Sequence, residues 1–238
     1  MFLKMKVSVI IPTYNAKPEY LTEAIGSVIN QTIKPYEIII VDDGSDESII
    51  GTFASSADNI KIIRNEKNMG IGFSRQRGVE ESTGEYIAFL SSDDVWDERF
   101  LEVMIKITEK YPNKILYSNY FFINDKSKII GNAKVKDFNY KDFCVACWEN
   151  AERNTMFVNF STTFFPKEVF EKVQFDKSLR FGEDLDFLLR SMKHFEYYFV
   201  NDYLLRYRAI GNLTSRIFDK IPENNIKIRK NCMEYWNG

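Results

Sequence analysis

Two adjacent carboxylates, Asp93 and Asp94, follow two serines at the end of an apolar run that extends from Tyr86 to Leu90. An aspartate in such a place often caps the next helix, because its oxygens accept the free N–H groups of the first turn. Two neighbouring acids repel each other, however, and a divalent cation would offset that repulsion. Magnesium and manganese prefer oxygen ligands and usually share them with substrate phosphates. The pair therefore indicates a metal site more strongly than a cap.

A second acidic pair, Asp42 and Asp43, ends another apolar run and leads into a Gly-Ser turn. Taken alone, this pair fits an Asx turn about as well as a ligand site, because aspartate side chains bond readily to turn backbone. Tyr14 and Asn15 follow a third apolar run, which Pro12 interrupts. Three separate segments thus place polar groups just after an apolar stretch.

The elements that would position these groups are strands that alternate with helices. Apolar, β-branched runs predict buried strands at residues 7–12, 37–45, 59–65 and 85–90. Apolar residues at helical spacing predict helices at 19–31, 71–83 and 97–112, with a short one ending near residue 56. This alternation predicts an α/β fold with a mixed, mainly parallel sheet flanked by helices. Ligands bind such sheets at the carboxyl ends of the strands, so the three polar segments are expected to meet at one edge.

Beyond residue 113 the pattern is less regular. A strand is predicted at 115–125, a helix at 182–195 and a pair of short strands at 197–211, whereas 139–166 is aromatic and without a clear period. The polar tail from residue 219 mixes lysine and arginine with apolar residues, which favours a solvated face and leaves open a surface that rests on anionic lipid. No internal repeat divides the chain, so a single domain is expected.

Composition excludes several classes of protein. With 238 residues, 45% of them hydrophobic, the chain can bury a sizeable core, and its net charge of −2 gives no basic field for nucleic acid. Cys144 and Cys147 form a CxxC without the second pair that a four-thiolate zinc site needs, so free thiols in a reducing cytoplasm are expected. The sequence shows no secretory signal, and no apolar run approaches the roughly 20 residues that a membrane helix requires. The protein is therefore expected to be soluble or peripheral.

Five segments together resemble the family-2 inverting glycosyltransferases of the GT-A fold, a Rossmann-like nucleotide-diphospho-sugar transferase fold. They are VSVIIPTYN (7–15), EIIIVDDGS (37–45), NMGIGFSRQRG (68–78), GEYIAFLSSDD (84–94) and GEDLDF (182–187), in matching order and spacing. The resemblance implies a nucleotide-sugar donor, commonly a UDP-sugar, and a divalent metal, Mn²⁺ or Mg²⁺. It also implies transfer of the sugar to an acceptor hydroxyl with inversion at the anomeric carbon.

The resemblance assigns five residues to the donor, of which Asp93 is also a metal ligand. Pro12 and Tyr14 match positions that contact the nucleobase, with the aromatic ring packed on it. Asp42 matches the carboxylate that reads the base edge of uracil. Arg75 lies where the family often has an arginine near the donor.

The resemblance assigns the metal and the general base to acids. Asp93 matches the last acid of the D-x-D motif and is expected to bind both the metal and the donor, with Asp94 as a second metal ligand. Asp184, beside Glu183, matches the general base that takes the proton of the acceptor hydroxyl. An acidic helix start is the structural alternative for Asp184.

The chain departs from the family pattern at two positions. Ser91 stands where the family commonly has the first acid of D-x-D, which often contacts the donor ribose. Ile210 stands where many relatives carry a histidine, so a phosphate or metal contact from that loop is in doubt. Arg206 and Arg208 are open alternatives for a donor contact.

The predicted function is therefore transfer of a hexosyl or N-acetylhexosaminyl group to a glycan or lipid-linked saccharide in surface-polysaccharide synthesis, such as O-antigen or capsule. Residues 1–112 are expected to form the nucleotide-sugar-binding half and 113–218 the acceptor-binding half with the base. Residues 219–238 form a tail, and the protein is expected in the cytoplasm, with peripheral association at the inner membrane face open.

Two alternatives keep a similar fold. The first is a catalytically impaired nucleotide-sugar-binding or partner subunit, which Ser91 motivates. The second is a sugar-phosphate nucleotidyltransferase, disfavoured because PTYNAKPEY (12–20) replaces the glycine-rich basic loop expected after the first strand. A dinucleotide cofactor is disfavoured too, since Arg75 occupies the place of the third glycine after the GIG of residues 70–72.

Overall fold

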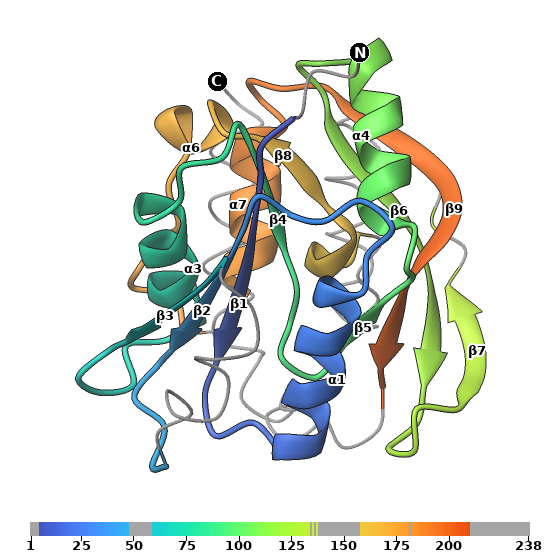
Figure 1. The fold of residues 1–238 in the computed structure, drawn as a ribbon. Helices are drawn as coiled ribbons and strands as arrows, with labels where there is room; N and C mark the ends of the chain where they lie inside the picture. Colours follow the sequence, from blue (N-terminus) through green and yellow to red (C-terminus); the bar gives the residue numbers. More distant parts are fainter. Residues whose placement is uncertain are drawn as a thin grey trace.

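The computed structural model describes residues 5–47, 59–133, 135, 137, 158–180 and 182–209. Within these ranges the chain forms one mixed sheet with helices on both of its faces (Figure 1). The predicted α/β class is therefore confirmed. No helix in the described part is long and apolar enough to cross a bilayer.

The first half of the sheet comes from the strand–helix alternation. Its strands pair in parallel in the order β3–β2–β1–β4, with bounds β1 (Val7–Thr13), β2 (Glu37–Asp42), β3 (Ile60–Arg64) and β4 (Tyr86–Phe89). Most of their side chains are buried, because helices cover the sheet on both sides. β1, β2 and β3 end at the lower edge in Figure 1, which is the edge that the polar segments were predicted to share.

The helices take the faces that their apolar stripes predict. They are α1 (Pro18–Ile29), α3 (Ile71–Glu80), α4 (Phe100–Lys110), α6 (Val169–Lys172) and α7 (Glu183–Ser191), with a 3₁₀ turn, η1, at Phe160–Thr162. In Figure 1, α1 and α4 lie on the near side of the sheet and α7 lies behind it. α3 packs on β1 and β2 and also against α7, so the starts of α3 and α7 come close together.

The second half of the sheet is built around β6, which has both parallel and antiparallel neighbours. β6 (Ile115–Ile123) and β9 (Tyr197–Arg208) pair in parallel, and β7 (Ile129–Ala133) is added antiparallel to β6. The short β8 (Phe164–Pro166) lies antiparallel between β4 and β6 and joins the two halves. Most paired residues are in parallel ladders, as predicted, although the sheet is mixed.

Two details differ from the prediction. The pair of short strands predicted at 197–211 is wrong, because β9 is one continuous strand whose register against β6 shifts near Asn119. The exposed Asn201 and Asp202 interrupt the apolar pattern like a turn, but they lie within the strand beside that irregularity, where Asn119 donates to Asn201. The two-residue strand β5 (Val95–Trp96), paired with β9 directly after the acidic turn, was not predicted.

Several predicted features fall outside the described residues. These are most of the short helix expected to end near residue 56, the CxxC of Cys144 and Cys147, residue Ile210 and the basic tail. The part of the aromatic segment that is described forms η1 and β8.

A cluster of phenylalanine rings fills the space between the sheet and α7. The rings of Phe89, Phe160, Phe165, Phe170, Phe175 and Phe187 contact one another, with centroids between 4.5 and 6.4 Å apart. Aromatic pairs at such distances add to the free energy gained by burial alone. The cluster therefore fixes α7, whose first turn carries the acids of the GEDLDF segment.

Gly78 of α3 packs directly against Ile10 of β1, and alanine there should destabilise the protein. A Cβ at Gly78 would lie 2.4 Å from Cγ2 of Ile10, so the helix or the strand would have to shift. Such overpacking costs about 1–3 kcal/mol. Gly26 in α1 is the matched control, since a Cβ there meets nothing within 4 Å and alanine is the better helix former. Urea unfolding should show a lower midpoint for Gly78→Ala and a higher one for Gly26→Ala, and a shift in the same direction would contradict this packing.

Candidate active site

The loops after β1 and β2 are tied to each other at the carboxyl edge of the sheet. The N–H of Asn15 donates to Ser45 Oγ at 3.0 Å, and the side chain of Asn15 exchanges hydrogen bonds of 2.9 Å with Asp46. Asn15 takes a positive φ of 45°, which asparagine tolerates better than most residues. The two polar segments predicted to meet at this edge therefore do so.

Pro12 and Tyr14 occupy the end of β1. Pro12 is buried, and β4 pairs with β1 only as far as Ile10, so the missing N–H of proline falls beyond the end of that neighbour. Tyr14 is half-buried just after the strand. These positions are compatible with the predicted contact to a nucleobase at the edge.

Asp42, the predicted reader of the base, is completely buried and already bonded. One oxygen accepts the N–H of Ser45 at 3.0 Å, and the other forms an ion pair with Arg64. Arg64 also donates to the carbonyl of Ser45 at 2.5 Å and keeps 31% of its side chain exposed. Arg64 was not predicted, because nothing in the pattern of β3 marks its last residue as a partner of β2.

Asp43 holds the start of α3. Its carboxylate accepts the N–H groups of Met69 and Gly70 at 2.9 and 2.8 Å, and the amide of Asn65 at 2.6 Å. Gly70 precedes the first helical residue with φ of 97°, a conformation that suits glycine. The second acid of this pair therefore has a structural role.

The two acids after β4 are also unequal. Asp94 is 1% exposed, and its oxygens accept the N–H of Arg208 and the hydroxyl of Ser161, both at 3.0 Å. Burial, and then the charge of Asp93, raise the pKa of Asp94 well above its usual range. Asp93 is half-buried at the edge, and its main-chain carbonyl accepts from Arg208 Nε at 2.8 Å. These bonds give Asp94 a structural role, whereas Asp93 is half-buried beside it.

Ser91, which replaces the first acid of the motif, belongs to the same network. Its N–H donates to Ser161 Oγ at 3.1 Å, and that hydroxyl lies 3.2 Å from Ser91 Oγ. Ser161 thus bridges Ser91 and Asp94, and η1 is held against the end of β4.

Arg75, predicted near the donor, forms a buried ion pair with Glu183. Its Nη1 lies 2.5 Å from Glu183 Oε1, and its guanidinium stacks 4.5 Å above the ring of Phe160. The Nε of Arg75 is buried and makes no hydrogen bond. Burial and the neighbouring charge of Asp184 raise the pKa of Glu183 to about 7, while Arg75 opposes that rise.

Asp184, the predicted base, lies in the first turn of α7. It is half-buried, and one of its oxygens accepts the N–H of Leu185 at 2.8 Å. The helix begins after Gly182, whose φ of 73° makes the sharp entry possible. Asp184 therefore stands beside the buried Glu183 as Asp93 stands beside the buried Asp94.

Short chains of contacts link the three acidic segments. Asp43 accepts a hydrogen bond from Gly70, and a Cβ added at Gly70 would lie 3.8 Å from the side chain of Arg180. A Cβ added at Gly72 would lie 3.2 Å from Cγ of Glu183, so Gly72 packs against Glu183. The other link runs from Asp94 through η1 and Arg75 to Glu183. The structure thus ties all three segments into one region.

The donor set fits a metal shared with a ligand rather than a closed protein cage. Among the described residues, no group of three or more His, Cys, Asp or Glu side chains could hold a metal ion. Mg²⁺ is typically bound through one or two carboxylates together with substrate phosphates. Asp93 suits that arrangement.

A separate surface hollow of about 490 Å³ lies near the start of β6 and does not include these acids. Its lining includes Tyr111, Lys114 and His194. The single histidine of the chain therefore lies away from the acidic turns.

Comparison with known proteins decides the family. Residues 8–174 match the family described as glycosyl transferase family 2, which covers more than half of the chain. The chain belongs to glycosyl transferase family 2. It is therefore a glycosyltransferase, as the sequence segments predicted.

Relatives within family 2 include proteins with and without a known reaction. The chain is 31% identical over 222 residues to an uncharacterized glycosyltransferase of Methanocaldococcus jannaschii, covering 90% of this chain and 75% of that protein. It is 32% identical over 167 residues to the Escherichia coli UDP-Glc:alpha-D-GlcNAc-diphosphoundecaprenol beta-1,3-glucosyltransferase WfgD, covering 68% and 66%. Among curated relatives it spans from 25% to 75% of their lengths.

Solved structures confirm the GT-A fold. The structure of Staphylococcus aureus TarS residues 1–349 in complex with UDP-GlcNAc matches with a TM-score of 0.69 and 20% identity, over 87% of this chain and 59% of that one. The predicted fold of this family 2 chain is therefore confirmed.

The stability of the protein should depend on pH through Glu183. Its pKa of about 7 exceeds the ordinary value of 4.5, so the folded protein binds this proton more tightly than the unfolded chain does. The free energy of unfolding should therefore fall as pH rises from 4.5 through 7. Glu183→Gln cannot titrate and should show a shallower fall in urea unfolding followed across that window. Equal slopes for the two proteins would show that Glu183 does not carry this dependence.

Proposed function

We propose that the protein transfers a sugar from a nucleotide-sugar donor, a UDP-sugar in the first instance, to a hydroxyl of a glycan or lipid-linked saccharide, with inversion. One observation carries the proposal. In two acidic pairs the fold uses one member, Asp94 or Glu183, as a buried anchor and leaves its neighbour, Asp93 or Asp184, half-exposed. The half-exposed members are the acids expected at the metal and at the acceptor.

The donor would lie along the carboxyl edge of β1, β2 and β4. Tyr14 would pack on the base, with Pro12 beneath it, and Asp42 would accept from the base edge. A carboxylate offers about four lone-pair positions, and Ser45 and Arg64 use two of them. Because Asp42 is fully buried, a base would reach it only if the partly exposed Arg64 moved aside.

Two named relatives support the choice of UDP. The TarS structure contains UDP-GlcNAc, and the name of WfgD gives UDP-Glc as its donor. The two proteins have different sugars on the same nucleotide. This favours uracil as the base of the donor here and does not identify its sugar.

Asp93 would hold the divalent ion, Mn²⁺ or Mg²⁺, together with the diphosphate. When bound, such an ion neutralises the negative charge that develops on the leaving diphosphate. Asp94, predicted as a second metal ligand, is proposed instead to lie beside the ion and to hold the turn through Ser161 and Arg208.

Asp184 would act as the general base. The acceptor oxygen forms a bond to the anomeric carbon as the bond from that carbon to the diphosphate breaks, and Asp184 takes the hydroxyl proton. Arg75 would act through Glu183, since their ion pair fixes the first turn of α7. This arrangement gives Arg75 a supporting role rather than the direct donor contact predicted from the sequence.

The acceptor is proposed to be carried on a lipid at the cytoplasmic face of the inner membrane. The acceptor in the name of WfgD is a saccharide on diphosphoundecaprenol. A peripheral enzyme of surface-polysaccharide synthesis would meet its acceptor there, with residues 1–112 on the donor and 113–218 on the acceptor.

A binding or partner subunit without activity is the second candidate, because Ser91 lacks the first acid. A screen that scores nucleotide release from UDP-, GDP- and dTDP-sugars with Mn²⁺ or Mg²⁺ separates the two. Release from a UDP-sugar above the rate without protein supports the enzyme, whereas UDP binding without any release supports the partner subunit.

Asp184→Asn should nearly abolish transfer and spare donor binding, because only removal of the proton is lost. Loss of a general base lowers rates by about 100-fold or more. Calorimetry with UDP and Mn²⁺ should give an affinity close to that of the parent protein. Asp202→Asn, at an exposed position of β9, is the matched control and should keep normal turnover. Near-normal turnover in Asp184→Asn would remove Asp184 as the base.

Asp93→Ala should remove the gain in UDP affinity that Mn²⁺ provides. UDP affinity without metal should change little, since the alanine leaves the proposed base contacts in place. The check is calorimetry of both proteins with and without Mn²⁺. An undiminished gain in the variant would show that Asp93 is not the metal ligand.

A further inference from the structure

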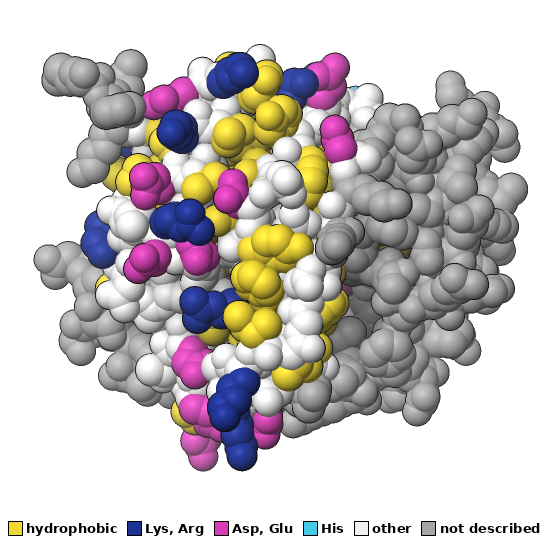
Figure 2. All heavy atoms as spheres, turned by 90° about the vertical axis from the view of Figure 1, so that its right-hand side faces the viewer, with side chains coloured by type: hydrophobic (Ala, Val, Ile, Leu, Met, Phe, Trp, Pro, Cys, Tyr) yellow, Lys and Arg dark blue, Asp and Glu magenta, His cyan; other side chains and the backbone are white. Residues whose placement is uncertain are grey.

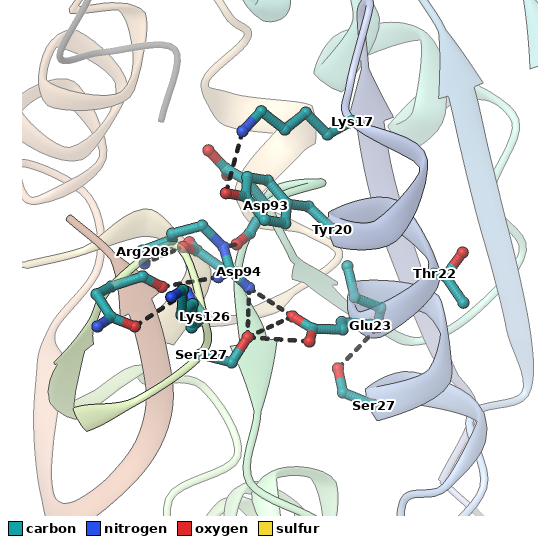
Figure 3. A network of polar contacts seen from close by, with 12 residues as sticks. Lys17, Tyr20, Thr22, Glu23, Ser27, Asp93, Asp94, Lys126, Ser127 and Arg208 are labelled. Atoms are coloured by element: carbon teal, nitrogen blue, oxygen red, sulfur yellow. Dashed lines mark hydrogen bonds and ion pairs between the residues drawn. The ribbon is translucent and has the colours of Figure 1, made fainter. Parts of the chain in front are cut away.

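Arg208, at the end of β9, is the largest side chain that the described part of the chain buries completely. Figure 3 shows its guanidinium enclosed between the turn that carries Asp93 and Asp94 and the helix α1. Its burial excludes the direct donor contact that the sequence left open for it. A completely buried guanidinium needs a full set of partners, because an unpaired buried charge is strongly unfavourable.

Arg208 holds the acidic turn at two successive residues. Its Nε donates to the main-chain carbonyl of Asp93 at 2.8 Å. The main-chain N–H of Arg208 donates to Oδ1 of Asp94 at 3.0 Å. Arg208 therefore fixes both the peptide group between Asp93 and Asp94 and the side chain of Asp94.

The outer nitrogens of Arg208 hold two further elements. Nη1 donates to the carbonyl of Asn124 at 2.9 Å, and Nη2 donates to Ser127 Oγ at 3.1 Å in the β6–β7 turn. Nη2 also forms an ion pair of 2.5 Å with Glu23 of α1, which accepts from Ser127 with both oxygens. The ring of Tyr20, also in α1, lies 3.9 Å from the guanidinium carbon.

The geometry requires an arginine. The donors on Arg208 leave the guanidinium in several fixed directions, toward Asp93, toward the β6–β7 turn and toward Glu23. A lysine carries its charge at one point and could not reach all three partners from one position. The β6–β7 turn and α1 therefore form a fixed wall against which Arg208 holds the acidic turn (Figure 3).

We propose that Arg208 is a positioning residue for the donor site, which sets the direction in which the side chain of Asp93 leaves the turn. The inference rests on the proposed function, in which Asp93 holds a divalent ion shared with the donor. Arg208 itself touches neither, since it acts through the carbonyl of Asp93 and through Asp94. Residues that orient metal ligands in this way change metal affinity by about 10- to 100-fold when they are replaced.

The first test is Arg208→Lys, which keeps the charge and removes the divergent donors. The quantity measured is the gain in UDP affinity on adding Mn²⁺, from calorimetry, together with the urea midpoint. We expect that gain to fall about 10-fold or more, while UDP affinity without metal stays within about twofold. A merely structural arginine would lower the midpoint and leave the gain unchanged, which would overturn the proposal.

Arg190→Lys is the matched control for lost hydrogen bonds. Arg190 donates to Asp186 and to the carbonyl of Gln174, neither of which belongs to the acidic turn. Its replacement should lower the urea midpoint and leave the Mn²⁺ gain intact. An equal loss of the gain in both lysine variants would assign the effect to stability and overturn the proposal.

Glu23→Ala gives a second test if Arg208→Lys does not fold. Glu23 keeps 44% of its side chain exposed, and alanine suits a helix, so this variant should fold. It should lose part of the Mn²⁺ gain, whereas Glu19→Ala, at an exposed position on the same helix, should lose none. An unchanged gain in Glu23→Ala overturns the positioning role. If Asp93→Ala keeps its gain as well, the metal assignment of the proposed function fails; if it loses the gain, only the positioning role fails.

Discussion

Burial of carboxylates at the ends of β2 and β4 determines the shape of the whole edge. A buried carboxylate without donors is highly unfavourable, so Asp43 and Asp94 must draw hydrogen-bond donors from elsewhere in the chain. Asp43 takes main-chain N–H groups at the start of α3, and Asp94 takes Ser161 and Arg208. A few such bonds determine where α3, η1 and the end of β9 lie. The loops of the edge are therefore set by electrostatic necessity as much as by apolar packing.

The same need for hydrogen-bond donors accounts for the arrangement of two acidic pairs, Asp93 with Asp94 and Glu183 with Asp184. A carboxylate anchored by the fold fixes the backbone of its neighbour, and the neighbour can then face outward in a defined direction. The arrangement has an electrostatic cost, since the charge of Asp93 helps to raise the pKa of Asp94, and that of Asp184 helps to raise the pKa of Glu183. Arg75 lowers that cost for Glu183 through a direct ion pair.

Local periodicity predicted the first four strands, the helices α1 and α3 and the edge on which the polar segments meet. These features depend on neighbours in sequence, so a single chain reveals them. The division of roles within the acidic pairs was not predictable, because the partners of Asp94 lie 67 and 114 residues away and the partner of Arg75 lies 108 residues away. The two-residue β5 is too short to show a period, and polar residues inside β9 made one strand look like two.

The short β8 leaves a narrow seam down the middle of the sheet. It pairs with β4 at three positions but with β6 at one, where Leu116 faces Phe164. On the β4 side, the stacked rings of Tyr86 and Phe164, with centroids 5.3 Å apart, reinforce the three paired positions, whereas the β6 side depends on side-chain packing beyond its single paired position. Side-chain packing tolerates exchange of residues more readily than strand register does. The two sides of the seam can therefore diversify at different rates, which under the proposed division of the chain would let acceptor preference change on one side while donor binding is kept on the other.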